Sequence, residues 1–347
     1  MDISSLLVNK DMSIRKGIDI LDKNGKKFIV VVEDKKLIGV VTDGDIRRWI
    51  LKNGDISKST DNIMTKSPKY LQIEERNNVK EIMNKYKIEA VPIVNKEKEV
   101  VDVVFWSDVY NNQLTYFETN NIPIVIMAGG KGTRLQPYTK IIPKMLVPIG
   151  EIPIIERIIN NFVNFNFNDF YVTINYKKDI IKAYFNKETS YDISFVEEDT
   201  PLGTAGSLTL LKDNIKSTFF VSNCDILVDA NYSDILKFHK KCQNKITIVI
   251  LLKNYVIPYG VFNLNDDGSI LSLDEKPRYE FLVNTGMYIL EKDVLEYIEE
   301  NKYADMTDII YKLIENKEKI GIYPVTEGAW LDMGEFESMK HMIDKLV

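Results

Sequence analysis

Apolar strand runs alternate with helical patterns along the last two thirds of the chain. The strand runs are short and strongly hydrophobic, and they are IVIMA, FYVTIN, ISFVE, TFFVSN, ITIVILL and YGVFNL. Amphipathic stretches lie between them, for example IIERIINNFVNF, KKDIIKAYF and YSDILKFHKK. Because such strands joined by helices are typical of a mostly parallel sheet covered on both faces, we predict an α/β domain over 122–347. Ligands of such sheets bind beyond the carboxyl ends of the strands.

The first third of the chain contains an internal repeat. FIVVVEDKKLIGVVTDGDIRR, residues 28–48, aligns without gaps with VPIVNKEKEVVDVVFWSDVYN, residues 91–111, and a helical stretch precedes each copy. Each copy therefore predicts helix, strand, turn, strand and helix. Two copies are too few for a solenoid, so we predict one pseudo-symmetric α+β module over 1–118. The polar stretch QLTYFETNN, residues 113–121, is predicted to link it to the second domain.

A loop rich in glycine and cations follows the first strand of the α/β domain, within IVIMAGGKGTRLQPYTKIIPKMLVPIG. Its glycines and cations are Gly129, Gly130, Gly132, Lys131, Arg134 and, further on, Lys144. Glycines let backbone N–H groups approach an anion, and the cations neutralise its charge, so the loop predicts a phosphate site. The GxxxxGK[ST] pattern does not fit. The GxGxxG pattern fails because Leu135 stands where the third glycine belongs.

Composition narrows the class of protein. A chain of 347 residues with 45% hydrophobic content can form two domains with sizeable cores. A net charge of −6 gives no electrostatic footprint for nucleic acid. Cys224 and Cys242 offer no disulfide framework, and no apolar run approaches the ~18 residues of a membrane span, so we expect a cytoplasmic protein without membrane contact. Cys224 is predicted to serve packing, and His239 and His341 to be solvated surface residues.

The pattern GGxGTRLxPxT followed by PKxLxPI closely resembles the signature of the sugar-1-phosphate nucleotidyltransferases, which have a Rossmann-like fold and make NDP-sugars. The resemblance implies attack by a sugar-1-phosphate oxygen on the α-phosphorus of an NTP, with release of pyrophosphate. Both reactants are anionic, so positioning and electrostatics carry the catalysis and no nucleophilic side chain is needed. By the family pattern, the catalytic residues are Arg134, which would hold the triphosphate, and Lys144, which would contact the α-phosphoryl group.

The same resemblance implies Mg²⁺ as cofactor, and this ion takes oxygen ligands. Asp225 in FFVSNCDIL and Asp332 in WLDMGEFES match the two metal-binding aspartates of the family. PLGTAGS, residues 201–207, resembles the loop on the nucleobase side and favours GTP. The implied nucleotide-binding residues are Ala128, Gly129, Gly130, Gly132, Thr133, Gly203, Thr204 and Ala205.

Three further elements resemble the sugar-facing parts of these enzymes. LDEKP matches the EKP element, in which Glu275 would take sugar hydroxyls and Lys276 the sugar phosphate. VNTGMYIL offers Asn284 and Thr285, and PYGVF offers Gly260. The implied substrates are an NTP and a sugar-1-phosphate of the glucosamine or mannose type.

The N-terminal repeat resembles a tandem CBS pair, a regulatory module that binds adenosine nucleotides or related ligands. In that family a [ST]xxD element contacts ribose and phosphate, and Thr42 and Asp45 match it in the first copy. Phe105 replaces the hydroxyl residue in the second copy, whereas Asp108 keeps the carboxylate. We therefore expect one competent site for a regulatory nucleotide or nucleotide-sugar. The alternative is a dimerisation module without a ligand.

The order of a CBS pair and a short nucleotidyltransferase resembles the glucosamine-1-phosphate guanylyltransferases of bacterial legionaminic acid pathways. We expect a homo-oligomer. Two other functions stay open. One is a catalytically inactive nucleotidyltransferase fold used as a sensor or scaffold, and the other is a cytidylyl-, uridylyl- or thymidylyltransferase on the same fold.

Overall fold

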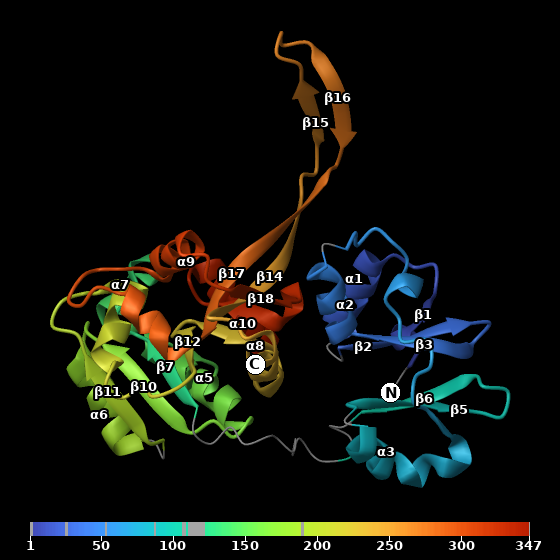
Figure 1. Cartoon of the computed structure of the whole chain (residues 1–347), viewed down its shortest axis with the longest axis horizontal. Helices are drawn as coiled ribbons and strands as arrows, with labels where there is room; N and C mark the ends of the chain where they lie inside the picture. Colours follow the sequence, from blue (N-terminus) through green and yellow to red (C-terminus); the bar gives the residue numbers. More distant parts are fainter. Residues whose placement is uncertain are drawn as a thin grey trace.

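The computed structural model describes residues 3–24, 27–52, 54–86, 88–105, 109, 122–188 and 191–346. Two domains lie side by side, with the N-terminal domain in blue and teal and the C-terminal domain in green to red (Figure 1). The predicted linker 113–121 lies outside the described residues. Within the described part, no helix is both long enough and apolar enough to cross a bilayer.

The N-terminal domain consists of two similar halves. The first comprises β1 (Leu7–Asn9), α1 (Ile14–Asn24), β2 (Phe28–Glu33), β3 (Lys36–Thr42) and α2 (Asp43–Ile50). The second comprises β4 (Leu71–Gln72), α3 (Val79–Tyr86), β5 (Ala90–Val94) and β6 (Val100–Phe105). The sheet orders are β1-β2-β3 and β4-β5-β6, and in each sheet the first pair is parallel and the second antiparallel. The two copies of the repeat therefore fold alike.

The two halves contact one another through equivalent positions of the repeat. The N–H of Leu37 donates to the carbonyl of Lys98 at 3.0 Å, and the N–H of Val100 donates to the carbonyl of Lys35 at 3.1 Å. The rings of Phe28 and Phe105 pack edge to face at 6.1 Å within an apolar cluster that both halves share. This reciprocity gives the pseudo-symmetric module that the repeat predicted.

A seven-stranded sheet forms the centre of the C-terminal domain. In spatial order its strands are β11 (Ile193–Glu197), β10 (Asp169–Ile174), β7 (Pro123–Met127), β12 (Phe219–Asn223), β17 (Arg278–Leu290), β14 (Ile246–Val256) and β18 (Ile320–Val325). β17 is antiparallel to both its neighbours, and the other neighbouring strands are parallel. The mostly parallel sheet is therefore confirmed. Strands that follow β7 in the chain are added first on one side of it (β10, β11) and then on the other (β12). The topological switch point, where the strand order reverses and ligands bind, therefore lies between β7 and β12.

Helices cover both faces of this sheet, because successive strand side chains point to opposite sides. Ile124 and Ile126 of β7 pack into one core, whereas Val125 and Met127 pack into the other. The first core includes residues of α5 (Ile154–Val163), α6 (Lys178–Glu188), α8 (Tyr232–Cys242) and α10 (Phe336–Leu346). The second includes residues of α7 (Gly203–Gly206), η7 (Ser207–Leu211), η8 (Lys292–Tyr297) and α9 (Met306–Glu315).

One strand run lies outside the main sheet. YGVFNL forms β15 (Gly260–Leu264), which pairs only with β16 (Ile270–Glu275) in an antiparallel hairpin. This hairpin stands at the end of a two-stranded ribbon in which β14 and β17 extend beyond the sheet (Figure 1). We call residues 253–282 the arm. The alternation of side chains predicted a strand here, but a period of two does not indicate which strand becomes its partner.

Candidate active site

The glycine-rich loop begins directly after β7, at the switch point. Gly132 adopts φ 62°, and a Cβ there would come within 2.9 Å of Thr139 Cγ2 and 3.1 Å of Lys144 Cβ. Gly132 is therefore required by the local fold. A Cβ at Gly130, in contrast, would meet no atom within 4 Å. The space beside Gly130 is open, so a ligand can approach the backbone there.

Lys144 and Asp225 form an ion pair beside this loop. Lys144 opens the short helix η6 (Lys144–Leu146), and Asp225 follows β12, the neighbour of β7. Both side chains are largely buried, with 14% and 12% of their surface exposed. The order of the strands brings these residues together, because β7 and β12 end at the same edge of the sheet.

A short second sheet brings Asp332 to the same place. β13 (Ile226–Val228) pairs with β19 (Trp330–Asp332), and Ile226 lies opposite Asp332. The N–H of Met333 donates to the carbonyl of Asp225 at 2.8 Å, which links the ends of both strands. The two predicted metal-binding aspartates are therefore neighbours in space, although they lie far apart in the sequence.

The electrostatics of this cluster suit a cation. Burial raises the pKa of the Asp332 carboxyl, the charge of Asp225 raises it further, and Lys144 counteracts both. Asp332 Oδ1 accepts one hydrogen bond, from the N–H of Gly334 at 2.9 Å. No group of three or more acidic, histidine or cysteine ligands gathers among the described residues. Mg²⁺ needs only one or two carboxylates when substrate phosphates and water complete its shell, so this pair of carboxylates fits that ion.

Arg134 lies at the mouth of the site. Its side chain is 66% exposed, and its guanidinium is 3.6 Å from Glu335 Oε1, which is equally exposed. An exposed guanidinium is available to a phosphate that enters from solvent. Lys131 and Thr133 are also exposed on this loop.

Glu198 packs against the glycine-rich loop at Gly129, and no sequence motif indicated a role for it. Its side chain is buried, and Oε2 accepts a hydrogen bond from the N–H of Leu202 at 3.0 Å. A Cβ at Gly129 would come within 2.5 Å of Oε1, so only glycine lets the loop pass this carboxyl group. Burial raises the pKa of Glu198. In the sequence nothing separates it from the adjacent Glu197, whose carboxylate pairs with lysines at the surface.

The predicted nucleobase loop lies on the other side of Glu198. Gly203 adopts φ 79°, and a Cβ there would come within 2.5 Å of the carbonyl of Ala304. That carbonyl accepts from the N–H of Ala205 at 2.8 Å, and Thr204 Oγ1 donates to Asp305 at 3.2 Å. These contacts fix the loop against the start of α9. Contact of Thr204 and Ala205 with a base stays a prediction.

The predicted sugar-facing residues fall into two groups. Thr285 is buried in β17, and its carbonyl accepts from the indole N–H of Trp330 at 3.2 Å, two residues before Asp332. Asn284, its neighbour, donates to the hydroxyl of Tyr288 at 2.7 Å. Gly260, Glu275 and Lys276 lie on the arm instead. Thr285 is therefore linked to the strand that ends at Asp332, whereas Gly260, Glu275 and Lys276 lie on the arm, outside the central sheet (Figure 1).

One histidine differs from its prediction. His239 is fully buried, and its ring nitrogens contact Thr247 Oγ1 at 2.8 Å and Glu291 Oε1 at 3.2 Å. Burial lowers its pKa. The prediction was wrong because α8 is charged on one face only and His239 lies on the face that packs against β14. His341 is exposed. Cys224 is buried, as predicted, and burial raises the pKa of its thiol to about 12.

The candidate CBS ligand residues hold the start of α2. Thr42 is the N-cap: its hydroxyl accepts from the N–H of Asp45 at 3.2 Å, and its own N–H donates to the Asp45 carboxylate at 2.8 Å. Asp45 also pairs with Arg48. Both candidate side chains therefore already serve as caps. Phe105 packs in the shared core, and Asp108 lies outside the described residues.

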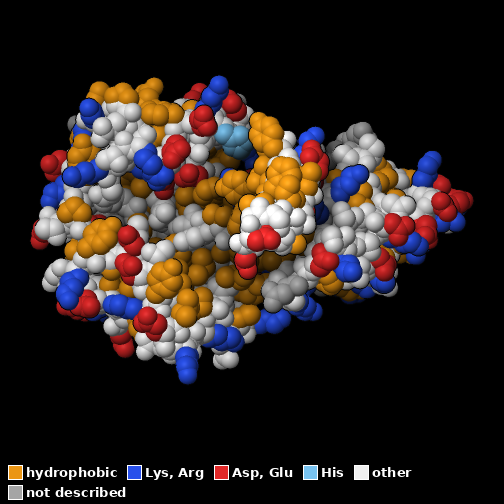
Figure 2. All heavy atoms as spheres, turned by 90° about the horizontal axis from the view of Figure 1, so that it is seen from above, with side chains coloured by type: hydrophobic (Ala, Val, Ile, Leu, Met, Phe, Trp, Pro, Cys, Tyr) orange, Lys and Arg blue, Asp and Glu red, His pale blue; other side chains and the backbone are white. Residues whose placement is uncertain are grey.

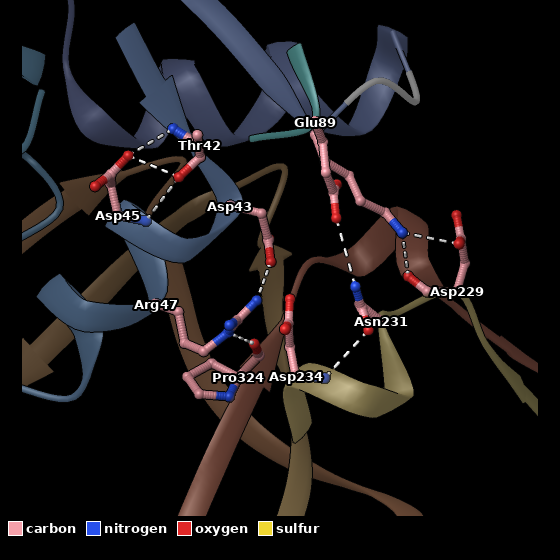
Figure 3. Close-up of polar contacts among 10 residues, drawn as sticks. Thr42, Asp43, Asp45, Arg47, Glu89, Asp229, Asn231, Asp234 and Pro324 are labelled. Carbon is pink, nitrogen blue, oxygen red and sulfur yellow. Dashed lines mark hydrogen bonds and ion pairs between the residues drawn. The ribbon is translucent and has the colours of Figure 1, made fainter. Parts of the chain in front are cut away.

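The same helix α2 contacts the C-terminal domain (Figure 3). Arg47 Nε donates to the carbonyl of Pro324 in β18 at 3.2 Å, and its guanidinium lies 3.8 Å above the ring of Tyr323. Asp43, one turn earlier on α2, forms an ion pair with Arg47. A cavity of about 10 Å³, the size of one water, lies beside them. β18 leads through η9 (Glu327–Ala329) directly into β19 and Asp332.

Two further contacts join the domains at the start of α8. Lys27 Nζ donates to Asp229 Oδ1 at 2.8 Å, and Asn231, the N-cap of α8, donates to Glu89 at 3.4 Å. Figure 3 shows these residues approaching from both halves of the N-terminal domain. Each half of the CBS-like module therefore contacts the catalytic domain.

Comparison with known proteins assigns the C-terminal domain to a family. Residues 124–346, more than half of the chain, match the model of the nucleotidyl transferase family, and residues 1–52 match that of the CBS domain. The chain belongs to the nucleotidyl transferase family and carries an N-terminal CBS domain.

Curated relatives agree with this assignment, and a solved structure shares the fold. The chain is 35% identical over 225 residues to the mannose-1-phosphate guanyltransferase of Saccharomyces cerevisiae, an alignment that covers 61% of each. It is 31% identical over 238 residues to the bifunctional protein GlmU of Methanococcus maripaludis, covering 64% of this chain and 55% of the relative. The crystal structure of HddC from Yersinia pseudotuberculosis matches 65% of this chain over its whole length, with 23% identity and a TM-score of 0.52, and so shares the fold. The chain spans about three fifths of the length of these curated relatives.

Proposed function

We propose that the protein transfers a nucleotidyl group from an NTP to a sugar-1-phosphate, giving an NDP-sugar and pyrophosphate. One observation carries this proposal. Lys144, Asp225 and Asp332 converge beside the open glycine-rich loop at the switch point of the sheet. A protein used only as a sensor or scaffold would not need a lysine and two partly buried carboxylates in contact, since their charges must be taken out of water.

The chain's own residues account for binding and charge stabilisation. The N–H groups of the loop around Gly130 and the exposed guanidinium of Arg134 are placed to bind a triphosphate that enters from solvent. Lys144 already contacts one carboxylate, so its ammonium can turn to a phosphate oxygen without crossing the site. Preorganised cations of this kind stabilise the charge that develops on the α-phosphoryl group and on the leaving pyrophosphate.

Asp225 and Asp332 would hold Mg²⁺, which neutralises phosphate charge when it is bound. A bound cation would offset the mutual repulsion of the two carboxylates, and the Lys144 ammonium would then be available to a substrate phosphate.

We further propose GTP as the nucleotide and mannose-1-phosphate or glucosamine-1-phosphate as the sugar substrate. The support is the PLGTAGS loop together with the similarity to the guanyltransferase of Saccharomyces cerevisiae. In a competition with equal GTP, UTP, dTTP, CTP and ATP, we expect the GDP-sugar to exceed every other product by about tenfold, the scale of one good hydrogen-bonded discrimination. Product nucleotides are separated by chromatography. A UDP-, dTDP- or CDP-sugar as the main product would overturn the base assignment and leave nucleotidyl transfer standing.

Regulation through the CBS domain is the second part of the proposal. Thr42 caps helix α2, which contains Asp45 and Arg47. Arg47 contacts β18, and the chain runs from β18 to Asp332. A nucleotide that binds at Thr42 and Asp45 must compete with the cap hydrogen bonds of α2, so binding would shift the start of this helix. A ligand can change activity only by its different affinity for two such arrangements.

We expect an adenine nucleotide to bind the full chain at saturating GTP and to change kcat or KM by about 5-fold or more, the lower range of allosteric coupling. Arg47→Gln should keep the binding and lose the kinetic response, because it removes the contact with Tyr323 and Pro324. Asp45→Asn, which can still accept in the cap, should weaken the binding. Calorimetry and initial rates measure both effects. No binding of adenine, guanine or cytidine nucleotides or of the nucleotide-sugar product, with unchanged rates, would make the domain structural.

A further inference from the structure

Two segments at the mouth of the candidate active site touch each other at two points. One is the glycine-rich loop with the turn that follows it, and the other leads from β19 into α10. The guanidinium of Arg134 in the first segment lies 3.6 Å from Glu335 Oε1 in the second. The rings of Tyr138 and Phe336 lie 5.8 Å apart, with their planes inclined by 53°. Glu335 therefore places a negative charge beside the cation that a triphosphate would use.

The backbone that carries Glu335 is held in place by a turn and a helix end. The N–H of Gly334 donates to Asp332 Oδ1 at 2.9 Å, and a Cβ at Gly334 would come within 2.8 Å of Asp332 Oδ2, so a larger residue would push this carboxylate aside. The carbonyl of Glu335 accepts from the N–H of Met339 at 2.9 Å, which starts α10. These contacts fix the position of Glu335 relative to Asp332.

The backbone around Arg134 is fixed as well. Leu135, the next residue, is buried, and Thr139 Oγ1 donates to the carbonyl of Gly132 at 2.8 Å. The two side chains of the ion pair are both about two thirds exposed, in contrast. Exposed side chains change rotamer within picoseconds to nanoseconds. The pair between Arg134 and Glu335 can therefore open without a change in either backbone.

A phosphate can displace the carboxylate from this pair. Water and salt screen an exposed ion pair, so it changes an equilibrium by no more than about 5-fold. A phosphate group can accept two parallel hydrogen bonds from one guanidinium. Acidic and basic side chains are interspersed over the face that Figure 2 shows, and the whole chain has a net charge of −6. Because no wide positive field covers that face, we expect the local charges at Arg134 to decide how firmly a phosphate is held.

We propose that Glu335 is a positioning residue that competes with the triphosphate for Arg134. Its carboxylate pairs with the guanidinium before the triphosphate binds and again as pyrophosphate leaves. Glu335 therefore lowers the affinity of the site for both polyphosphates and favours the release of pyrophosphate. This proposal rests on the proposed function in one respect, the binding of a polyphosphate at Arg134.

Binding of pyrophosphate and GTP to the full chain tests the competition. Glu335→Gln removes the charge and keeps the size of this exposed side chain. We expect the variant to bind both ligands about 2- to 5-fold more tightly than the wild type in calorimetry at about 0.05 M salt. The difference should disappear at about 1 M salt, where the Debye length is only about 3 Å. In initial rates, the KM for GTP should fall by the same factor, with a smaller change in kcat.

Glu337→Gln is the matched control, because Glu337 is exposed in the first turn of α10 and carries the same charge. It should leave both affinities at the wild-type value. In an Arg134→Ala background, the gain from Glu335→Gln should vanish, since the two residues act as a contacting pair. An equal gain in the Glu337 variant, or an undiminished gain without Arg134, would show a general repulsion of phosphate and overturn the competition.

The outcome for Glu335 can be separated from the outcome for the proposed function. An active wild type whose affinities are unchanged by Glu335→Gln would overturn the competition and leave nucleotidyl transfer standing. A wild type that binds pyrophosphate, shows the expected pattern among the variants and forms no NDP-sugar would overturn the function and leave the competition standing.

Discussion

Asp225→Asn and Asp332→Asn should each lower kcat by about 10³-fold, the rate equivalent of the several kcal/mol of charge stabilisation that a metal ion supplies. Each change removes one of the two carboxylates that meet through β13 and β19. Pyrophosphate release at saturating GTP, sugar-1-phosphate and Mg²⁺ measures the effect. Asp266→Asn, at the exposed tip of the arm, is the matched control and should keep wild-type activity. Near-normal turnover of either active-site variant would contradict the metal assignment.

A stability measurement separates lost chemistry from lost folding in the Asp332 variant. The pKa of Asp332 is raised in the folded protein. Ionisation of Asp332 therefore destabilises the folded protein. This destabilisation is complete above the pKa of the folded state and absent below the pKa of the same carboxyl group in the unfolded chain. Asp332→Asn should therefore raise the Tm at neutral pH in the absence of Mg²⁺, with a smaller gain as the pH falls through the folded pKa. A variant that is inactive and also has a lower Tm at neutral pH would indicate a folding defect.

Lys144→Met should lower kcat by about 10²–10³-fold with a smaller change in KM, as expected when a preorganised charge contact to the transition state is lost. Methionine keeps most of the length and the apolar stem of this largely buried side chain, so the loop can retain its packing against Gly132. Lys140→Met is the control, since Lys140 is exposed on the same segment. Equal losses in both variants would contradict a special role for Lys144. A pH profile unchanged by Lys144→Met would contradict the effect of its charge on Asp332.

The sequence was sufficient to identify the candidate site residues that belong to local motifs. The glycine-rich loop and Asp225 follow neighbouring strands of the central sheet, and the winding of the chain brings their ends to one edge. Lys144 and Asp332 lie in short elements outside that sheet, and their sequence motifs indicated them. The position of Glu198 could not be predicted, because its burial depends on how closely Gly129 passes over it. His239 was misjudged for a similar reason: helical spacing shows that α8 has two faces, but the charged residues around His239 concealed which face it occupies.

The sequence also could not predict which elements the arm and the CBS domain contact. Alternating residues indicated strands at 260–264 and 270–275, but the distance between this hairpin and the glycine-rich loop depends on how far the β14–β17 ladder continues. The contacts of Arg47 with Tyr323 and Pro324 join residues from different domains, and no local pattern of charge or hydrophobicity indicates such a pair. The [ST]xxD element did indicate the start of α2, since Thr42 and Asp45 form the cap there.

Leu252 is part of the C-terminal domain in the sequence, but its side chain packs in a hydrophobic cluster of the CBS domain. The boundary between the two domains along the chain is therefore not the boundary between their hydrophobic interiors. A strand of the central sheet has one of its side chains enclosed by the neighbouring domain, and the arm starts at the next residue of the same strand. Loosening of the CBS domain would expose this leucine and release the base of the arm, so the stability of one domain sets the rigidity of an element that the other projects into solvent.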